Sequence, residues 1–521
     1  MSLFAARFGV GGNLLRFGCN LLGAGSRGRL LSTNRLPMIG TDVARDRLVA
    51  YFQETWSLTE MLFDGAHSGL YLRPADALRH PLIFYYGHVA SFYVNKLRLA
   101  GVDIRAPCHP FDELFAVGVD ENAEDAEKLS SFVFPDLAAV SSYREMVRSE
   151  VVRTIRTHPD LADDTVPIDT THPLWALYMA MEHERIHLET SAVLVRELPI
   201  QAVRRPDSFP DNHSSVPSLG QCRPERGIDY PTNVMCHCPD RVVAVGKPSD
   251  FTSYGWDNEY GYEQRRVVAS FMSQYMISNG QFHEFVAARG YSERRFWSAE
   301  GWRWKEQWTS KNGGTRKRSP PFWVEQPALG YQLRTMFEIV PMPWSWPAEV
   351  NYHEASAFCA WLSALDDIEY RLPTEAELLA MREATWPELA ATGQFDPVMD
   401  RALDSATISN AHGFNLNLSF GSPSPVDDEN HSTSCGFHDV LGNTWEWVSD
   451  DFHPIDGFQT HPLYEDFSVP TFDSDHKLIL GGSFMSTGAM ASKFCRFEKR
   501  PHFHLFTGFR VVSLDGHLDR P

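Results

Sequence analysis

The chain has 521 residues and a formal net charge of −20, from 47 basic and 67 acidic side chains. This length allows about two to four domains, and 43% apolar with 22% charged residues is ordinary for a soluble globular protein. The acidity argues against a protein that binds by neutralising nucleic-acid phosphates. No apolar run is long enough for a membrane span. Eight cysteines in this length do not form a disulfide scaffold, and no partner protein is evident.

Residues 1–41 differ from the rest because they carry five arginines and no acidic residue. Leucine, phenylalanine and serine lie between the arginines, which is the composition of an organelle-targeting presequence. Arginines interrupt every candidate apolar core of a secretory signal. We predict mitochondrial targeting, with a plain tail on a cytoplasmic protein or targeting to another compartment as the alternatives.

Residues 42–200 predict a helical domain, because apolar residues recur there at helical spacing. Four helices with long connections indicate a four-helix bundle. The expected helices run from Thr41 through Phe63, from Pro81 to Leu99, from Leu137 to Thr157 and from Pro173 to Glu197.

Residues 201–240, rich in Pro, Ser, Asp and Arg, predict a linker that partly wraps the surface. In residues 241–515, short β-rich runs alternate with Gly, Trp and Pro turns, and two helices are expected at Gly280–Arg289 and His353–Leu365. This alternation of short strands, turns and helices predicts an irregular α+β domain. Thr374 and Glu377 have the spacing of a helix-capping box. The fold class is therefore α + (α+β).

The sharpest local signal is the string His183-Glu184-Arg185-Ile186-His187 in the fourth predicted helix. Histidines at i and i+4 lie on one helix face, so both rings can reach one metal ion. Read literally, the string also fits a zinc protease with Glu184 as general base. A solvated helix face is the remaining alternative.

His88, in the middle of the second predicted helix, supplies a third imidazole. A lone histidine on an apolar face is more often a hydrogen-bonded core residue, but helix bundles commonly build metal sites from inward side chains. Imidazole ligands suit Fe(II), Zn, Cu and Ni alike, so the ligand type leaves the metal open.

Ordered motifs in both halves resemble a known family. Those at Arg371–Glu377, Gly442–Trp447, Gly481–Phe484 and Gly508–Arg510 resemble the formylglycine-generating-enzyme-like, sulfatase-modifying domain, a fold related to C-type lectins. The N-terminal bundle resembles the DinB-like half of nonheme iron sulfoxide synthases. The ovothiol branch, 5-histidylcysteine sulfoxide synthase, is the more similar one, on the strings Pro81–His88, Phe115–Glu121, Glu182–Thr190, Gly255–Gly261 and Arg500–His502.

The resemblance implies that His88, His183 and His187 bind Fe(2+), and that Tyr464 supplies a proton, or a proton and an electron. It implies O2-dependent C–S bond formation between cysteine and histidine, giving 5-histidylcysteine sulfoxide in the first step of ovothiol biosynthesis.

The carboxylates of two amino-acid substrates need cationic partners, for which Arg496 and Arg500 are the candidates. Glu498 lies between them in the sequence. It is the candidate partner of an α-ammonium group, or the structural counter-ion of the two arginines.

Other functions stay open. The nearest alternative is the ergothioneine-type reaction on trimethylhistidine. The pattern of that branch differs from this chain at Ile186 and at the acidic Asp120 and Glu121. These differences favour cysteine and unmodified histidine as the substrates. Formylglycine generation needs a cysteine pair where only Cys495 lies. A non-catalytic lectin-like binding protein is the alternative outside enzymes. We find no Gly-rich nucleotide-binding segment, so we expect any N-methylation to be carried out elsewhere.

Overall fold

The computed structural model describes residues 45–75, 79–105, 110–116, 133–161, 168–251, 253–311, 317–326, 330–385, 413–433 and 435–516. The predicted presequence 1–41, the expected helix start at Thr41, and Asp120 and Glu121 lie outside these residues.

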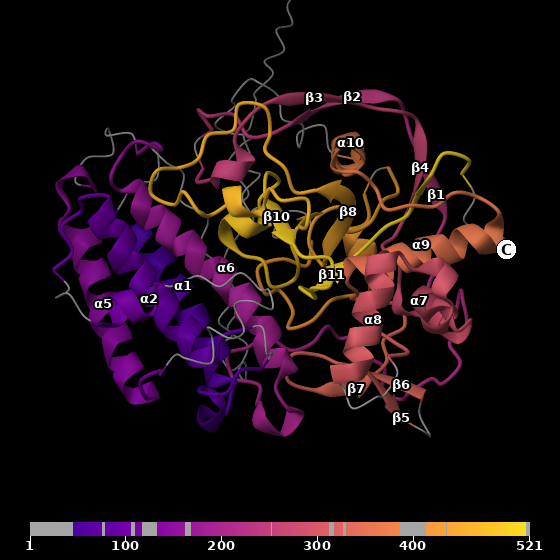
Figure 1. The fold of residues 1–521 in the computed structure, drawn as a ribbon, viewed down its shortest axis with the longest axis horizontal. Coiled ribbons are helices and arrows are strands. Elements are labelled where there is room, and N and C mark those ends of the chain that lie inside the picture. Colours follow the sequence, from indigo (N-terminus) through magenta and orange to yellow (C-terminus); the bar gives the residue numbers. More distant parts are fainter. Residues whose placement is uncertain are drawn as a thin grey trace, which may run out of the picture.

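The N-terminal domain is the predicted helical bundle (Figure 1). Its long helices are α1 (Arg45–Asp64), α2 (Leu82–Leu99), α5 (Leu137–Thr157) and α6 (Trp175–Glu197), with the short α3 (Pro110–Leu114) after α2. Three helix starts agree with the prediction to within two residues. The start of α5 follows from local chemistry, because the Asp136 carboxylate accepts a hydrogen bond from the Ala139 amide at 2.8 Å.

The second domain contains several small sheets, as expected of an irregular α+β domain. The central sheet has the order β10-β9-β8-β11 and the next one β1-β4-β12, and only β11 pairs in parallel, with β8. These strands are β1 (Met235–Cys238), β4 (Ser270–Ser273), β8 (Trp445–Asp451), β9 (Lys477–Leu480), β10 (Arg496–Lys499), β11 (Thr507–Gly508) and β12 (Val512–Ser513).

Two further sheets and, among the described residues, four helices complete the second domain (Figure 1). The hairpin β2 (Arg241–Val245) and β3 (Glu263–Val267) packs on α10 (Glu375–Thr385), and β5 (Trp323–Gln326), β6 (Gly330–Arg334) and β7 (Ile339–Pro341) form a meander. The other helices are α7 (Asn279–Ala287), α8 (Ala299–Lys311) and α9 (Tyr352–Asp366).

Some local predictions are confirmed here and others are corrected. Thr374 caps α10 as predicted, since its Oγ1 accepts from the Glu377 amide at 3.2 Å. Helix α8 is not among the predicted helices, because its glycine and tryptophans are poor helix formers and it is stabilised by packing on α9. Strand β1 lies inside the predicted linker 201–240, where no strand was expected; β1 is short and pairs with β4, which is distant in the sequence.

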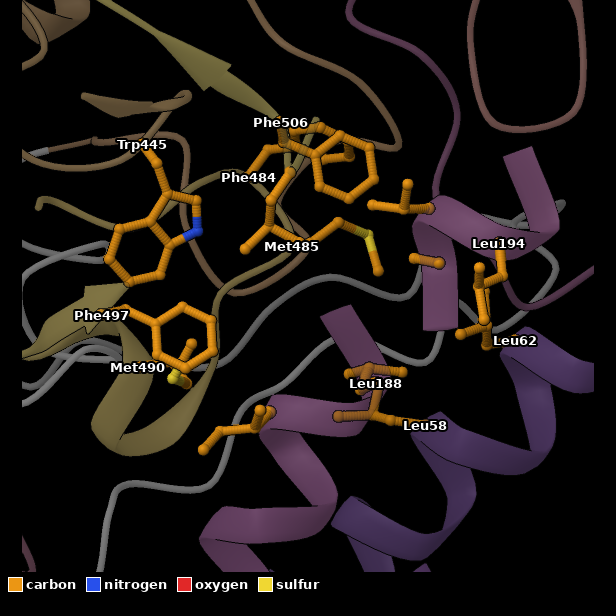
Figure 2. Close-up of a cluster of buried hydrophobic side chains, with 14 of the residues drawn as sticks. Leu58, Leu62, Leu188, Leu194, Trp445, Phe484, Met485, Met490, Phe497 and Phe506 are labelled. Atoms are coloured by element: carbon orange, nitrogen blue, oxygen red, sulfur yellow. The ribbon is translucent and has the colours of Figure 1, made fainter. Parts of the chain in front are cut away.

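The two domains share one hydrophobic core (Figure 2). Leu188 and Leu194 of α6 lie beside Leu58 and Leu62 of α1. Across from them lie Trp445, Phe484, Met485, Met490, Phe497 and Phe506. Because α6 is covered on one side by α1 and α2 and on the other by the second domain, nearly all of its residues are buried. Among the described helices, none is long and apolar enough to cross a membrane.

Candidate metal centre

Three histidine rings meet where α2 faces α6. His88 comes from α2, and His183 and His187 come from successive turns of α6. One ring nitrogen from each lies within 4.8 Å of the others, and Nε2 of His183 is 3.2 Å from Nε2 of His187. The predicted convergence of the three imidazoles is therefore confirmed.

The chemistry of these nitrogens fits a divalent metal ion. Burial lowers the pKa of His88 to about 4 and lowers the pKa values of His183 and His187 well below the usual range, which keeps all three rings neutral. Nδ1 of His88 lies 2.6 Å from the Phe115 carbonyl oxygen. Assigned as the donor of that bond, Nδ1 leaves the Nε2 lone pair of His88 for a metal, and such a bond orients metal-binding histidines in general.

Glu184 does not take part in this centre. Its side chain is fully buried on another face of α6, where Oε2 accepts from the Tyr93 hydroxyl at 2.9 Å and Oε1 lies 3.8 Å from Arg144. A residue one position after a ligand is turned by about 100° around the helix. The zinc-protease interpretation, with Glu184 as general base, is therefore wrong.

Tyr464 reaches the centre from the second domain. It lies in the loop between β8 and β9, and its ring centroid is 6.1 Å from that of His183 and 5.2 Å from that of Phe92. Burial raises the pKa of Tyr464, and the carboxylates of Asp466 and Glu498 raise it further. The side chain is therefore a neutral phenol that can donate a proton near the histidines.

The three histidines and Tyr464 line one cavity of about 340 Å³. Its ring-bearing walls include Phe84, Tyr85, Phe92 and Phe497. Its charged lining residues are Arg79, Lys96, Asp466, Glu498 and Lys499. A cavity with aromatic walls and charged groups of both signs suits small zwitterions.

The structure separates the three predicted substrate-binding residues. Glu498 lines the cavity, but Arg496 and Arg500 do not. Arg496 is buried, and its Nε donates to Glu375 at 2.6 Å. Arg500 follows β10 and lies 4.0 Å from Asp475. Neither arginine lines this cavity, because the part of β10 that reaches it runs from Phe497 to Lys499.

Three cationic residues that were not predicted from the sequence line the cavity, whereas those two arginines do not. Lys499 follows Glu498 directly, and Arg79 lies just before α2, where no sequence pattern marks it. Lys96 could have been found from its spacing in the sequence, because it lies eight residues after His88, on the same face of α2. That spacing identifies it as a neighbour of the metal centre.

Comparisons with known proteins agree with this architecture. Residues 231–514 match the family described as "Sulfatase-modifying factor enzyme 1-like domain", and residues 51–191 match the "DinB superfamily". Relatives include "Ergothioneine biosynthesis protein 1" of Neurospora crassa, 23% identical and covering 84% of this chain and 54% of the relative, and its namesake in Schizosaccharomyces pombe, 23% identical and covering 84% and 52%. "Hercynine oxygenase" of Mycolicibacterium thermoresistibile is 28% identical and covers 86% and 91%.

The chain spans about half the length of the first two of these relatives and most of the third. The sulfatase-modifying match covers more than half of this chain, and the bundle with its three histidines precedes it. The chain therefore belongs to the sulfatase-modifying factor enzyme 1-like family. It is a two-domain member that also contains a DinB domain, and it is homologous to the nonheme iron sulfoxide synthases.

Proposed function

We propose that this chain is an iron(II)- and O2-dependent enzyme that joins cysteine to histidine and yields 5-histidylcysteine sulfoxide. The observation that carries the proposal is the convergence of three neutral imidazoles from two helices with one phenol from the second domain, around a cavity of about 340 Å³. The names of the relatives support oxygen chemistry on an imidazole-bearing substrate.

His88, His183 and His187 would hold the iron through one ring nitrogen each. Three ligands on one side of an ion leave positions for small molecules. When bound, ferrous iron supplies a site where a thiol loses its proton and O2 is activated. The remaining steps depend on groups of the protein that position the substrates, exclude water and move a proton.

The charged lining residues match two amino-acid substrates. Arg79 and Lys499 offer positive charge to the carboxylates, and Glu498 and Asp466 offer acceptors to the ammonium groups. Holding both substrates in one cavity replaces a rare encounter by a reaction between neighbours. Tyr464 Oη would deliver its proton on the side of the cavity next to His183.

The choice of histidine over its trimethylated form rests on the carboxylates. An α-ammonium group donates N–H bonds to Glu498 or Asp466, whereas a trimethylammonium group has no N–H and is recognised by aromatic faces. The second candidate function is sulfoxide formation on trimethylhistidine (hercynine). The name "Hercynine oxygenase" of a relative favours it.

Reconstitution under anaerobic conditions tests the proposal. The protein receives one equivalent of Fe(II), then O2 with cysteine plus either histidine or trimethylhistidine, and mass spectrometry identifies the products. We expect 5-histidylcysteine sulfoxide from histidine. Exclusive turnover of trimethylhistidine would establish the second candidate, and no C–S product from either would refute both.

Two histidine variants provide matched controls for this experiment. His183→Ala is expected to lose both iron and product, whereas His237→Ala, which alters an exposed histidine of β1, is expected to keep both. Iron bound by His183→Ala at the wild-type level would remove the assignment of the metal ligands.

A further inference from the structure

Lys96 connects the bundle to the loop that carries the phenol. It lies two turns after His88 on the same face of α2. Its Nζ donates to the Leu463 carbonyl oxygen at 2.6 Å and lies 4.0 Å from the centroid of the Tyr464 ring. A charge-assisted hydrogen bond and a cation–π contact from one side chain fix both the backbone and the ring at this point of the loop.

Phe92 continues this connection to the metal centre. Its ring lies 3.5 Å from the His183 ring, centroid to centroid, at an interplanar angle of 7°. It also lies 5.2 Å from the Tyr464 ring and 5.1 Å from Lys96 Nζ. The position of the phenol relative to the histidines is thus set by side chains that follow one another along α2.

The other contacts of the loop act on its later part or away from the tyrosine. Ser468 donates to Asp257, and Phe467 stacks on Trp256 at 4.2 Å, so the second domain itself holds the residues after the tyrosine. Before the tyrosine, His461 meets the Thr170 carbonyl oxygen at an exposed position. Next to the ring, Phe92 and Lys96 are the contacts that come from the helix bearing His88, and Lys96 also binds the loop backbone at Leu463.

The same loop forms a wall between two cavities. Tyr464 and Phe467 line both the cavity of the metal centre, of about 340 Å³, and a second cavity of about 1220 Å³ that extends to Trp175 and Tyr254. If the wall shifts, the metal centre opens to the larger space and to water. Displacement of the loop therefore changes both the reach of the phenol and the hydration of the site.

We propose that Lys96 is a positioning residue that fixes Tyr464 against the metal centre and thereby determines how oxygen is divided between two products. The proposal rests on the proposed function. In one outcome the thiol loses S–H, the imidazole loses C–H, a C–S bond forms, one oxygen atom goes to sulfur and the other leaves as water. In the other outcome both oxygen atoms go to cysteine sulfur, giving the sulfinate, and histidine is unchanged.

The first experiment needs no metal. Hydrogen exchange of the loop 457–468 is followed by mass spectrometry in metal-free wild type, Lys96→Met and Lys96→Arg. Methionine keeps the stem and loses the charge and the donor, so exchange in this loop should rise about tenfold, the effect of losing one charge-assisted hydrogen bond. Arginine, which can donate to the same carbonyl and stack on the ring, should restore most of the protection.

Lys493→Met is the matched control, because it removes another lysine that lies over aromatic rings, those of Phe251 and Phe494, and that does not line the cavity of the metal centre. It should leave the loop unchanged. If Lys96→Met does not fold, as judged by circular dichroism, Lys96→Leu, which also lacks the charge and the donor, takes its place. Unchanged exchange of the loop in the neutral variant, or an equal change in Lys493→Met, would overturn the proposal.

The second experiment measures the ratio of sulfoxide to cysteine sulfinate with iron loaded. Lys96→Met should lower this ratio about tenfold at unchanged iron content, and Lys96→Arg should recover it. An unchanged ratio despite a loosened loop overturns the proposed control of the products. If wild type makes no C–S product at all, the proposed function fails, while the exchange result still decides whether Lys96 holds the loop.

Discussion

Glu189 provides the most direct test of how the two domains are held together. Two residues after His187 on α6, its fully buried carboxylate accepts hydrogen bonds from Trp445 Nε1 at 2.7 Å, from the Ser483 hydroxyl and from the Ser486 hydroxyl at 2.7 Å. All three donors belong to the second domain. Glu189→Ala leaves them without this acceptor at the domain interface.

The expected loss of stability follows from these three donors. The indole N–H of Trp445 points in a fixed direction, so losing its buried partner costs about 1–3 kcal/mol. The two serines lose less, because a hydroxyl hydrogen can rotate toward another acceptor, whereas the indole N–H cannot. The sum is about 3 kcal/mol, equivalent to a fall in Tm of about 3 °C for a chain of this length that unfolds as one unit.

Urea unfolding of the metal-free protein, followed by tryptophan fluorescence, measures this loss. Glu189→Gln keeps the volume and one acceptor oxygen, so it should lose about 1 kcal/mol. Glu197→Ala, at the exposed end of α6, should change the free energy of unfolding by less than about 0.5 kcal/mol. A Glu189→Ala variant as stable as wild type would refute the view that this buried carboxylate joins the domains.

Three further predictions concern the site and the pH dependence. Tyr464→Phe should keep iron and shift products from the sulfoxide to cysteine sulfinate, and an unchanged product ratio would end the role of Tyr464. His88→Ala should lower iron affinity by at least about tenfold in metal titrations while the second domain stays folded by near-UV circular dichroism. Burial raises the pKa of Glu354, but Lys317, 3.2 Å away, and His504 lower it to about 2. The charged form of Glu354 therefore contributes about 3 kcal/mol to the free energy of unfolding above pH 4.5, and this contribution is lost as the pH falls toward 2. Chemical denaturation at pH 6 and at pH 3.5 should show that the free energy of unfolding falls less between these pH values in Glu354→Gln than in wild type.

The elements predicted from the sequence are those whose signal is local. The ends of α2, α5 and α6 agree with the structure because apolar periodicity and capping residues act within a few turns. Helix α8 and strand β1 were missed because their stability comes from α9 and β4, which are distant in the sequence or provide no local pattern. The boundaries of the domains and the targeting role of residues 1–41 remain predictions.

The residues of the candidate site also include some that were predicted from local patterns and others that were not. The i and i+4 spacing of His183 and His187 placed both rings on one face of a helix before any fold was known, and the position of His88 in a second apolar helix completed the set. The spacing alone did not determine where Glu184 points relative to the partner helix. Arg496 was misassigned because sequence proximity to Glu498 says nothing about which part of β10 reaches the cavity.

The amino-acid sequence by itself determined the long helices of the bundle and the pair of histidines on one face, because these depend on contacts within a few residues along the chain. Only the tertiary structure decided that Arg79 and Lys499 line the cavity of the histidines, and that Arg496 turns to Glu375 instead. The cavity lies between two domains, and its lining depends on how a loop and a strand of one domain pack against a helix of the other, a relation that no local pattern of residues encodes.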